Sequence, residues 1–103
     1  MAGRRTPGIR VYIKRTFCTQ ILWSRECRIL VEIPKLRFKG SYWTHESPGW
    51  VEELWHLIFR KGKLLKRRKD TEIYWLPVNA KEELKEIVEK AKKEAEKKQA
   101  PLA

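Results

Sequence analysis

Alternation of apolar and polar side chains in the first third of the chain is the feature that most constrains its fold. Between Ile9 and Cys18 the odd positions hold Ile9, Val11, Ile13 and Phe17, whereas most polar side chains, joined by Tyr12, fall on even positions. Residues 21–33 repeat this pattern, and Pro34 ends the run. Because side chains of a strand point alternately to its two faces, both stretches are predicted to be half-buried strands.

One residue interrupts the second alternating stretch and leaves two interpretations of it. Arg25 falls on an otherwise apolar position. A turn at residues 24–26 would split the stretch into a hairpin, whereas a bulge there would keep a single long strand. The alternation does not choose between them. A third strand-like run follows at residues 36–43, with Lys35, Arg37 and Lys39 on one face.

The first predicted helix has clear signals at both ends. Ser47 is the expected N-cap, Pro48 the first helical residue, and Gly62 the stop. Apolar side chains cover most of the intervening segment, so this helix is expected to pack at the centre of the core.

A hairpin and a second helix complete the chain. Residues 63–69 and 72–76 are strand-like and flank a turn at 69–71. Asn79 is the expected N-cap of the last helix, since Glu82 follows three residues later as in a capping box.

This order of elements predicts a single-domain α+β fold. A chain of 103 residues buries one core, and the connections between strands are too short for parallel crossovers. We expect a mainly antiparallel sheet of about five strands, in the order β-β-β-α-β-β-α, with two helices packed on one face. The domain spans 9–98, including a C-terminal helix at 79–98 whose distal part projects. A flexible basic arm at 1–8 and a disordered tail at 99–103 flank it.

The basic charge of the chain is regional. The formal net charge is +11, but residues 1–69 hold 17 basic and 5 acidic side chains while residues 70–103 hold 7 and 8. A field of this kind attracts polyanions, nucleic acid before anionic membrane, because contact releases condensed counterions. A solvated surface would usually intersperse both signs. Nucleic acid is therefore the expected partner, and a membrane is not.

Composition also bears on habitat and location. The acids are twelve Glu and one Asp, and Asn and Gln are scarce, a pattern typical of thermophiles. No apolar run is long enough for a membrane span or a signal peptide. We expect a cytoplasmic protein of a thermophilic archaeon or bacterium, or of its virus.

The first candidate site is the sheet face turned away from the helices. Cations contact phosphates and aromatic rings stack on unpaired bases, so a surface that mixes both suits single-stranded nucleic acid. The alternative is an ordinary solvated face, with the tryptophans in the core. The candidates on this face are Arg10, Tyr12, Lys14, Arg28, Lys35, Arg37 and Lys39, with Tyr42, Trp43, Tyr74 and Trp75 beside them.

The second candidate site is residues 60–69, where seven of ten side chains are basic and none is acidic. Phosphate contact is their expected use. The basic residues are Arg60, Lys61, Lys63, Lys66, Arg67, Arg68 and Lys69. With a helix before it and a strand after it, the segment resembles the wing of a winged-helix protein, which implies a regulator that binds double-stranded DNA. That fold also needs an upstream helix-turn-helix, where this sequence alternates like strands.

Catalytic and metal-binding patterns are weak. Glu52 and His56 share a helix face, which a solvated polar stripe explains better than a metal site does. No nucleophile or phosphate-loop motif is present, although a small basic ribonuclease, which needs no motif, stays an alternative. Cys18 and Cys27 match no zinc pattern. Their alternation places them on opposite faces of their strands, so we expect two free thiols.

Apolar side chains on outward positions predict self-association. Leu22 and Leu30 lie on the polar face of the second alternating stretch, and Ala91 and Ala95 extend the stripe of the last helix. Exposed apolar surface usually meets a partner, so we expect a homodimer. In layout, though in no residue motif, the predicted domain resembles single-stranded-DNA-binding proteins of thermophilic archaea. The leading expectation is a non-enzymatic nucleic-acid-binding protein without cofactor or metal.

Overall fold

Five strands and two helices form the domain. The computed structural model describes residues 7–98. The elements are β1 (Gly8–Ile21), β2 (Ser24–Ile33), β3 (Phe38–Trp43), α1 (Gly49–Lys61), β4 (Lys63–Arg68), β5 (Thr71–Pro77) and α2 (Lys81–Lys98). The predicted α+β class and the order β-β-β-α-β-β-α are confirmed. Of the predicted arm at 1–8 only the last two residues are described, and Gly8 already belongs to β1; the predicted tail at 99–103 lies outside the described residues.

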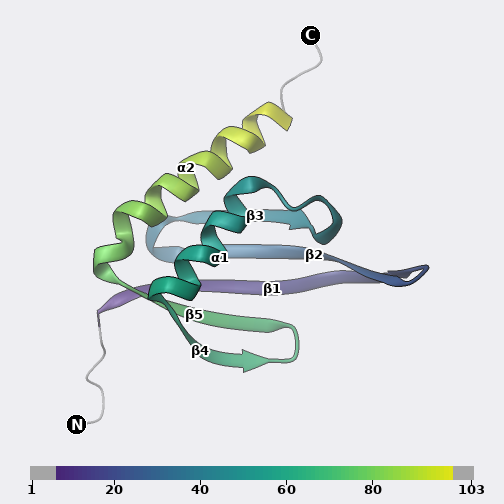
Figure 1. Ribbon diagram of the computed structural model, residues 1–103, viewed down its shortest axis with the longest axis horizontal. Helices are drawn as coiled ribbons and strands as arrows, with labels where there is room; N and C mark the ends of the chain where they lie inside the picture. Colours follow the sequence, from purple (N-terminus) through teal and green to yellow (C-terminus); the bar gives the residue numbers. More distant parts are fainter. Residues whose placement is uncertain (1–6, 99–103) are drawn as a thin grey trace.

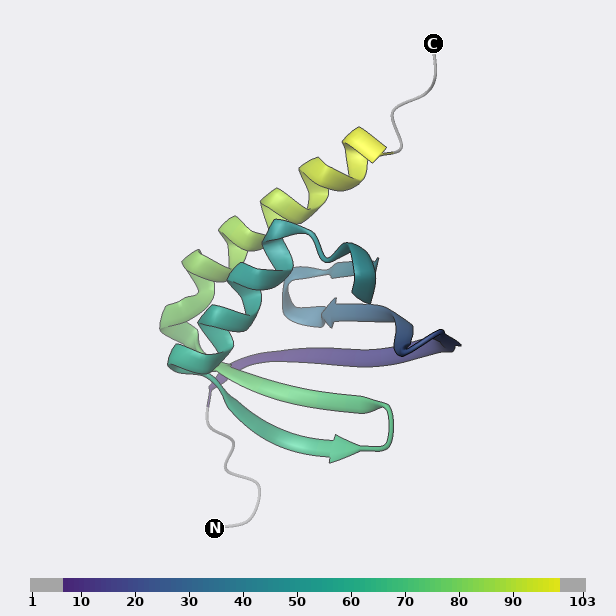
Figure 2. The same cartoon turned by 45° about the vertical axis from the view of Figure 1, so that its right-hand side comes forward.

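The strands form one antiparallel sheet in the order β3-β2-β1-β5-β4, so β1 is its central strand. Both helices lie on the same face of this sheet, α1 across its middle and α2 beside α1 (Figures 1 and 2). The other face carries no element of the described chain.

The core lies between the sheet and the two helices. Ile9, Val11 and Ile13 of β1 are buried, as the alternation predicts. Leu54 and Leu84 are the most deeply buried side chains of α1 and α2, together with Leu57. Each helix therefore turns its apolar stripe onto the same sheet face, which removes that face from water.

The ends of the helices differ slightly from the sequence-based expectations. Pro48, and not Ser47, takes the N-cap position of α1. Asn79 lies in a short 3₁₀ helix before α2, which begins at Lys81. Gly62 ends α1 as predicted; a Cβ there would approach both Ile58 O and a β5 carbonyl to 2.9 Å, so close packing requires glycine.

The β1–β2 hairpin corrects both interpretations of residues 21–33. The chain turns at Leu22 and Trp23, earlier than residues 24–26, and β2 starts directly afterwards. A bulge exists, but it lies in β1 between Thr16 and Thr19. Within it, Phe17 has a φ of 47°, in the left-handed region.

The same bulge overturns the expectation of two free thiols. Cys18 and Cys27 form a disulfide, with their Cα atoms 4.0 Å apart. The free-thiol prediction assumed unbroken alternation along β1. At the bulge two residues of β1, Phe17 and Cys18, face one residue of β2, so the alternation is reset and Cys18 turns to the side of Cys27.

The disulfide predicts a definite labelling pattern. Alkylation without reductant adds no label to the intact protein, and alkylation after reduction adds two. Replacing both cysteines by serine lowers the free energy of unfolding by about 2 to 3 kcal/mol, because the unfolded chain regains the freedom of a short closed loop. Intact mass and denaturant unfolding check the two parts. Two labels taken up before reduction would contradict the pairing.

Candidate nucleic-acid interface

The sheet face without helices, here called the open face, draws side chains from all five strands. Residues paired across antiparallel strands point to the same face, so the strand register defines its members. They are Arg10, Tyr12, Lys14 and Thr16 of β1; Arg28, Leu30 and Glu32 of β2; Lys39, Ser41 and Trp43 of β3; Lys63, Lys66 and Arg68 of β4; and Thr71, Ile73 and Trp75 of β5.

The charge of the open face is one-sided. It holds seven cations, Arg10, Lys14, Arg28, Lys39, Lys63, Lys66 and Arg68, against the single carboxylate of Glu32. Glu32 lies 4.0 Å from Lys39. The other six cations form no ion pair within residues 7–98. Five strands about 4.8 Å apart spread these charges over roughly 20 Å, the scale of a polyanion contact.

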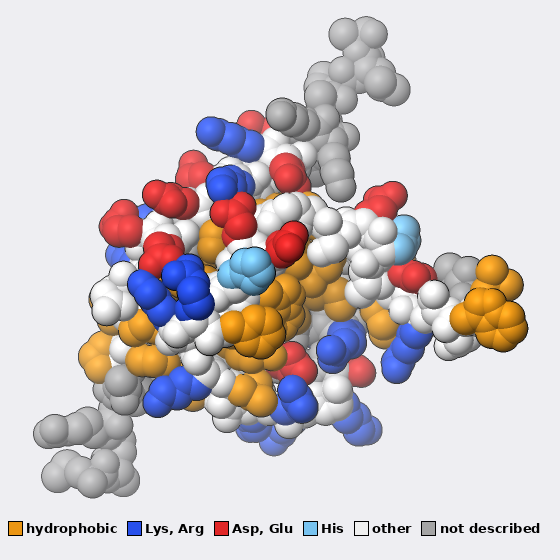
Figure 3. All heavy atoms as spheres, viewed as in Figure 1, with side chains coloured by type: hydrophobic (Ala, Val, Ile, Leu, Met, Phe, Trp, Pro, Cys, Tyr) orange, Lys and Arg blue, Asp and Glu red, His pale blue; other side chains and the backbone are white. Residues whose placement is uncertain are grey.

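Cations on the helix side lie among carboxylates, and several form ion pairs with them. Arg60 and Lys61 both contact the carboxylate of Glu83, at 3.0 and 2.6 Å. Lys90 of α2 donates to Glu53 of α1 at 2.7 Å. The hydrogen bonds from Lys61 and Arg60 hold the pKa of Glu83 below its usual range. Acidic and basic side chains accordingly intersperse over the two helices (Figure 3).

Three half-buried rings accompany the cations of the open face. The Arg28 guanidinium lies 5.4 Å from the centre of the Trp43 ring. The Lys63 ammonium lies 5.5 Å from that of Trp75. Trp75 rests on Gly8, where a Cβ would come within 1.9 Å of its indole nitrogen, so glycine gives the ring its place. Tyr12, on the central strand, has no ring or cation stacked on it within the described chain.

Most of the sequence-predicted residues lie on or beside the open face. Seven members of the first candidate site are on it: Arg10, Tyr12, Lys14, Arg28, Lys39, Trp43 and Trp75. Lys35 lies at its border, with Nζ 3.4 Å from Gly8 O. Arg37 is exposed in the β2–β3 connection, in the left-handed region. Of segment 60–69, the open face receives Lys63, Lys66 and Arg68, and Lys69 lies in the β4–β5 turn.

Two predicted rings belong to the opposite face. Tyr42 points toward α1 and packs edge-on against Trp50. Tyr74 is 9% exposed and packs edge-on against Trp55. The register therefore removes Tyr42 and Tyr74 from the predicted interface. Arg60 and Lys61 also leave it, because they are paired on the helix side, as described above.

Arg67 does not belong to the open face, because it forms an ion pair with a buried carboxylate. Glu72 is only 7% exposed on the helix face of β5. Arg67 Nε lies 3.2 Å from its carboxylate, Arg15 lies 3.9 Å away, and the Tyr74 hydroxyl donates to it at 2.7 Å. Burial and the bond to Glu72 raise the pKa of Tyr74. A buried carboxylate needs such partners, so this cluster is structural.

The sequence-based list did not separate Trp75 from Tyr74, although the two residues face opposite sides of the sheet. Parity along β5 holds the signal: Thr71, Ile73 and Trp75 share one face, and Glu72 shares the other with Tyr74. Two features made this parity hard to recognise in the sequence: the two aromatic residues are adjacent, and the polar residue Glu72 lies on the core side.

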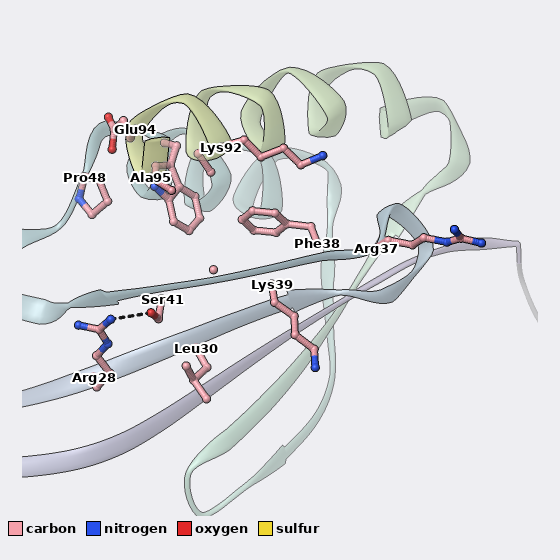
Figure 4. Close-up of a pocket in the computed structure, with 13 residues that line it drawn as sticks. Arg28, Leu30, Arg37, Phe38, Lys39, Ser41, Pro48, Lys92, Glu94 and Ala95 are labelled. Atoms are coloured by element: carbon pink, nitrogen blue, oxygen red, sulfur yellow. Dashed lines mark hydrogen bonds between the residues drawn. The ribbon is translucent and has the colours of Figure 1, made fainter. Parts of the chain in front are cut away.

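A groove adjoins the open face at the β3 edge (Figure 4). Its volume is about 540 Å³, and it lies between the distal turns of α2 and β3. Phe38 points up toward α2, whereas Leu30 and Lys39 point to the other side of the sheet. Arg28 donates to Ser41 at 2.8 Å across β2 and β3. The groove thus combines an apolar floor with a basic rim.

No other cluster in the described residues suggests a chemical site. Residues 7–98 contain no group of three or more potential metal ligands, and neither helix there is long and apolar enough to span a membrane. Glu52 and His56 are both exposed on α1. His45 Nδ1 lies 3.2 Å from Glu26.

Comparison with known proteins adds no assignment: the chain matches no protein-family model, no curated protein and no solved structure.

Because Tyr74 lies in the core, its substitution is predicted to change stability and not nucleic-acid binding. Tyr74→Phe removes one hydrogen bond to a buried carboxylate and lowers the free energy of unfolding by about 1.5 to 3 kcal/mol. Nucleic-acid affinity stays unchanged. Urea unfolding and a binding titration check the two parts, and unchanged stability with lost affinity would contradict the placement.

Proposed function

We propose that this protein binds single-stranded nucleic acid on the open face and catalyses no reaction there. The observation that carries the proposal is the segregation of charge. Six cations without a carboxylate partner in the described chain share the one sheet face that no helix covers, whereas α1 and α2 intersperse carboxylates with their cations and pair Arg60, Lys61 and Lys90. A solvated surface has no need for such segregation, whereas a polyanion-binding surface does.

The rings favour a single strand over a duplex. Tyr12, Trp43 and Trp75 are half-buried among the cations, which leaves part of each ring open to solvent. Unpaired bases can stack on such rings, but the bases of a duplex are already stacked on each other. A broad sheet also suits a flexible strand, because successive bases can settle on neighbouring β-strands.

The winged-helix alternative has less support. Strands β4 and β5 do form a hairpin after α1, but they continue the main sheet. The residues before α1 form β1, β2 and β3, where a helix-turn-helix would have to lie. The ribonuclease alternative has no described feature in its favour.

The homodimer stays a prediction. Leu30 is exposed on the open face, and Ala95 is exposed on α2. Ala91 is buried within its own chain, so it no longer argues for a partner.

Salt dependence tests the phosphate contacts. With about four to six contacts, log affinity for a single strand falls with log salt at a slope near −3 to −4. The double variant Lys66→Gln/Arg68→Gln loses two contacts, so its slope is flatter by about 1.4 and all sequences weaken alike. Fluorescence anisotropy at several salt concentrations measures this.

A matched control separates local contacts from net charge. Lys85→Gln/Lys93→Gln removes the same charge from exposed positions on α2. Its slope stays at the wild-type value. Equal flattening in both variants would show that total charge, and not the open face, governs binding.

Stacking is tested on the central strand. Tyr12→Ala weakens single-strand binding by about 1 to 3 kcal/mol without changing the salt slope, because a stacked ring releases no counterions. Phe59→Ala is the control, since it removes an exposed ring from α1 on the helix side. Normal binding by Tyr12→Ala, or an equal loss in both variants, would argue against a stacking surface.

A further inference from the structure

The β1–β2 hairpin continues beyond the sheet as residues 17–26, here called the arm, which is separate from the N-terminal arm predicted at 1–8. Pairing of β1 with β5 ends at Lys14, and pairing of β2 with β3 ends at Arg28. Farther out, the two strands pair only with each other. Figures 1 and 2 show the arm projecting past the other strands. Apolar side chains at its tip stand apart from those of the core (Figure 3).

The tip carries the two most accessible large apolar side chains of the described chain, Trp23 at 96% exposed and Leu22 at 84%. Phe17, beside the disulfide at the base of the arm, is 78% exposed. A two-residue hairpin turn would ordinarily use Gly, Asn or Asp. Leu22 and Trp23 lack the conformational preference for a tight turn, and their apolar side chains stay in contact with water instead of being buried in this chain.

The backbone conformation of the arm is also energetically unfavourable. Phe17 and Leu22 have φ values of 47° and 52°. Bulky residues rarely adopt this left-handed region, which costs about 1 kcal/mol or more where glycine would fit freely. Such outliers gather at functional sites, where the displayed side chain matters more than stability.

Two connections fix the arm relative to the sheet. The Cys18–Cys27 disulfide joins its strands near the base. Glu26 accepts a hydrogen bond from Thr44 at 2.9 Å, and Thr44 Oγ1 also accepts one from the backbone N–H of Cys27. A braced arm presents its tip at a fixed position and so loses less entropy on binding.

The charge around the arm indicates the kind of partner. Arg25 is exposed and has no ion-pair partner among the described residues, and Arg28 at the base belongs to the open face. The one acid of the arm, Glu26, is engaged by Thr44 and by His45 at 3.2 Å. The free charge of the arm is thus positive, with the open-face cation Arg28 at its base, and a positive arm complements a nucleic-acid strand.

We propose that the arm tip stacks Trp23 on, or inserts it between, unpaired bases of the same strand that the open face holds, with Leu22 packing beside it. This inference rests on the proposed function. A ring exposed on both sides can contact two bases at once, and apolar wedges of this kind separate neighbouring bases in other nucleic-acid complexes. The arm would thereby lengthen the site beyond the sheet.

Strand length distinguishes the arm from the open face. We compare a strand of about 6 nucleotides with one of about 20, each with a fluorescent adenine analogue whose emission stacking quenches. Trp23→Ala is expected to weaken binding of the long strand by about 5- to 100-fold and to relieve part of the quenching, while the short strand binds as before. Trp23→Phe keeps a ring and retains most of the affinity. An unchanged thermal midpoint confirms that both variants fold.

The outcomes separate the two proposals. Wild-type protein that binds both strands, with Trp23→Ala indistinguishable from it on both, overturns the role of the arm and leaves the open face standing; a tip that docks a protein would give this result. An equal loss on both lengths also overturns the arm as a separate extension. Failure of wild-type protein to bind either strand overturns both proposals.

Discussion

The pairing of β1 on both of its edges is the constraint on which the rest of the structure depends. As the central strand, β1 sets the register of β2 and β5, and through them the facing of β3 and β4. Its two-residue period sends Ile9, Val11 and Ile13 to the helices and the residues between them to the other face. Because α1 and α2 both cover the apolar face, one register defines the core and the open face together.

The electrostatics follow from this division. Helices bring their own carboxylates, and those of α1 and α2 neutralise cations on their side, as Glu83 does for Arg60 and Lys61. No helix of residues 7–98 lies on the open face, and Glu32 is the one acid that the described strands place there. The basic run at residues 60–69 is therefore divided between two sides of the domain: Arg60 and Lys61 stay with α1, and the strand period of β4 sends Arg67 to the helix side and its neighbours to the open face. The three-dimensional site is therefore smaller than the sequence suggests.

Local pattern predicted the fold and much of the candidate site, because strand parity is a local property. It placed Arg10, Tyr12 and Lys14 correctly from alternation alone. It failed at the bulge beside Phe17, which resets the alternation and turns Cys18 toward Cys27. A glycine would have indicated a bulge, but that stretch contains none. It also failed for Tyr74, because a buried Glu72 on the core side is satisfied by partners that only the folded chain supplies.

The five tryptophans offer the most direct test of the central claim that the open face binds the strand. Their indole N–H resonances report on separate places: Trp43 and Trp75 on the open face, Trp50 in the core, Trp55 on the helix side and Trp23 at the arm tip. In an NMR titration with a short single strand, we predict that the resonances of Trp43 and Trp75 shift while those of Trp50 and Trp55 stay in place. A shift of Trp55 with Trp43 and Trp75 unmoved would place the strand on the helix side and contradict the account.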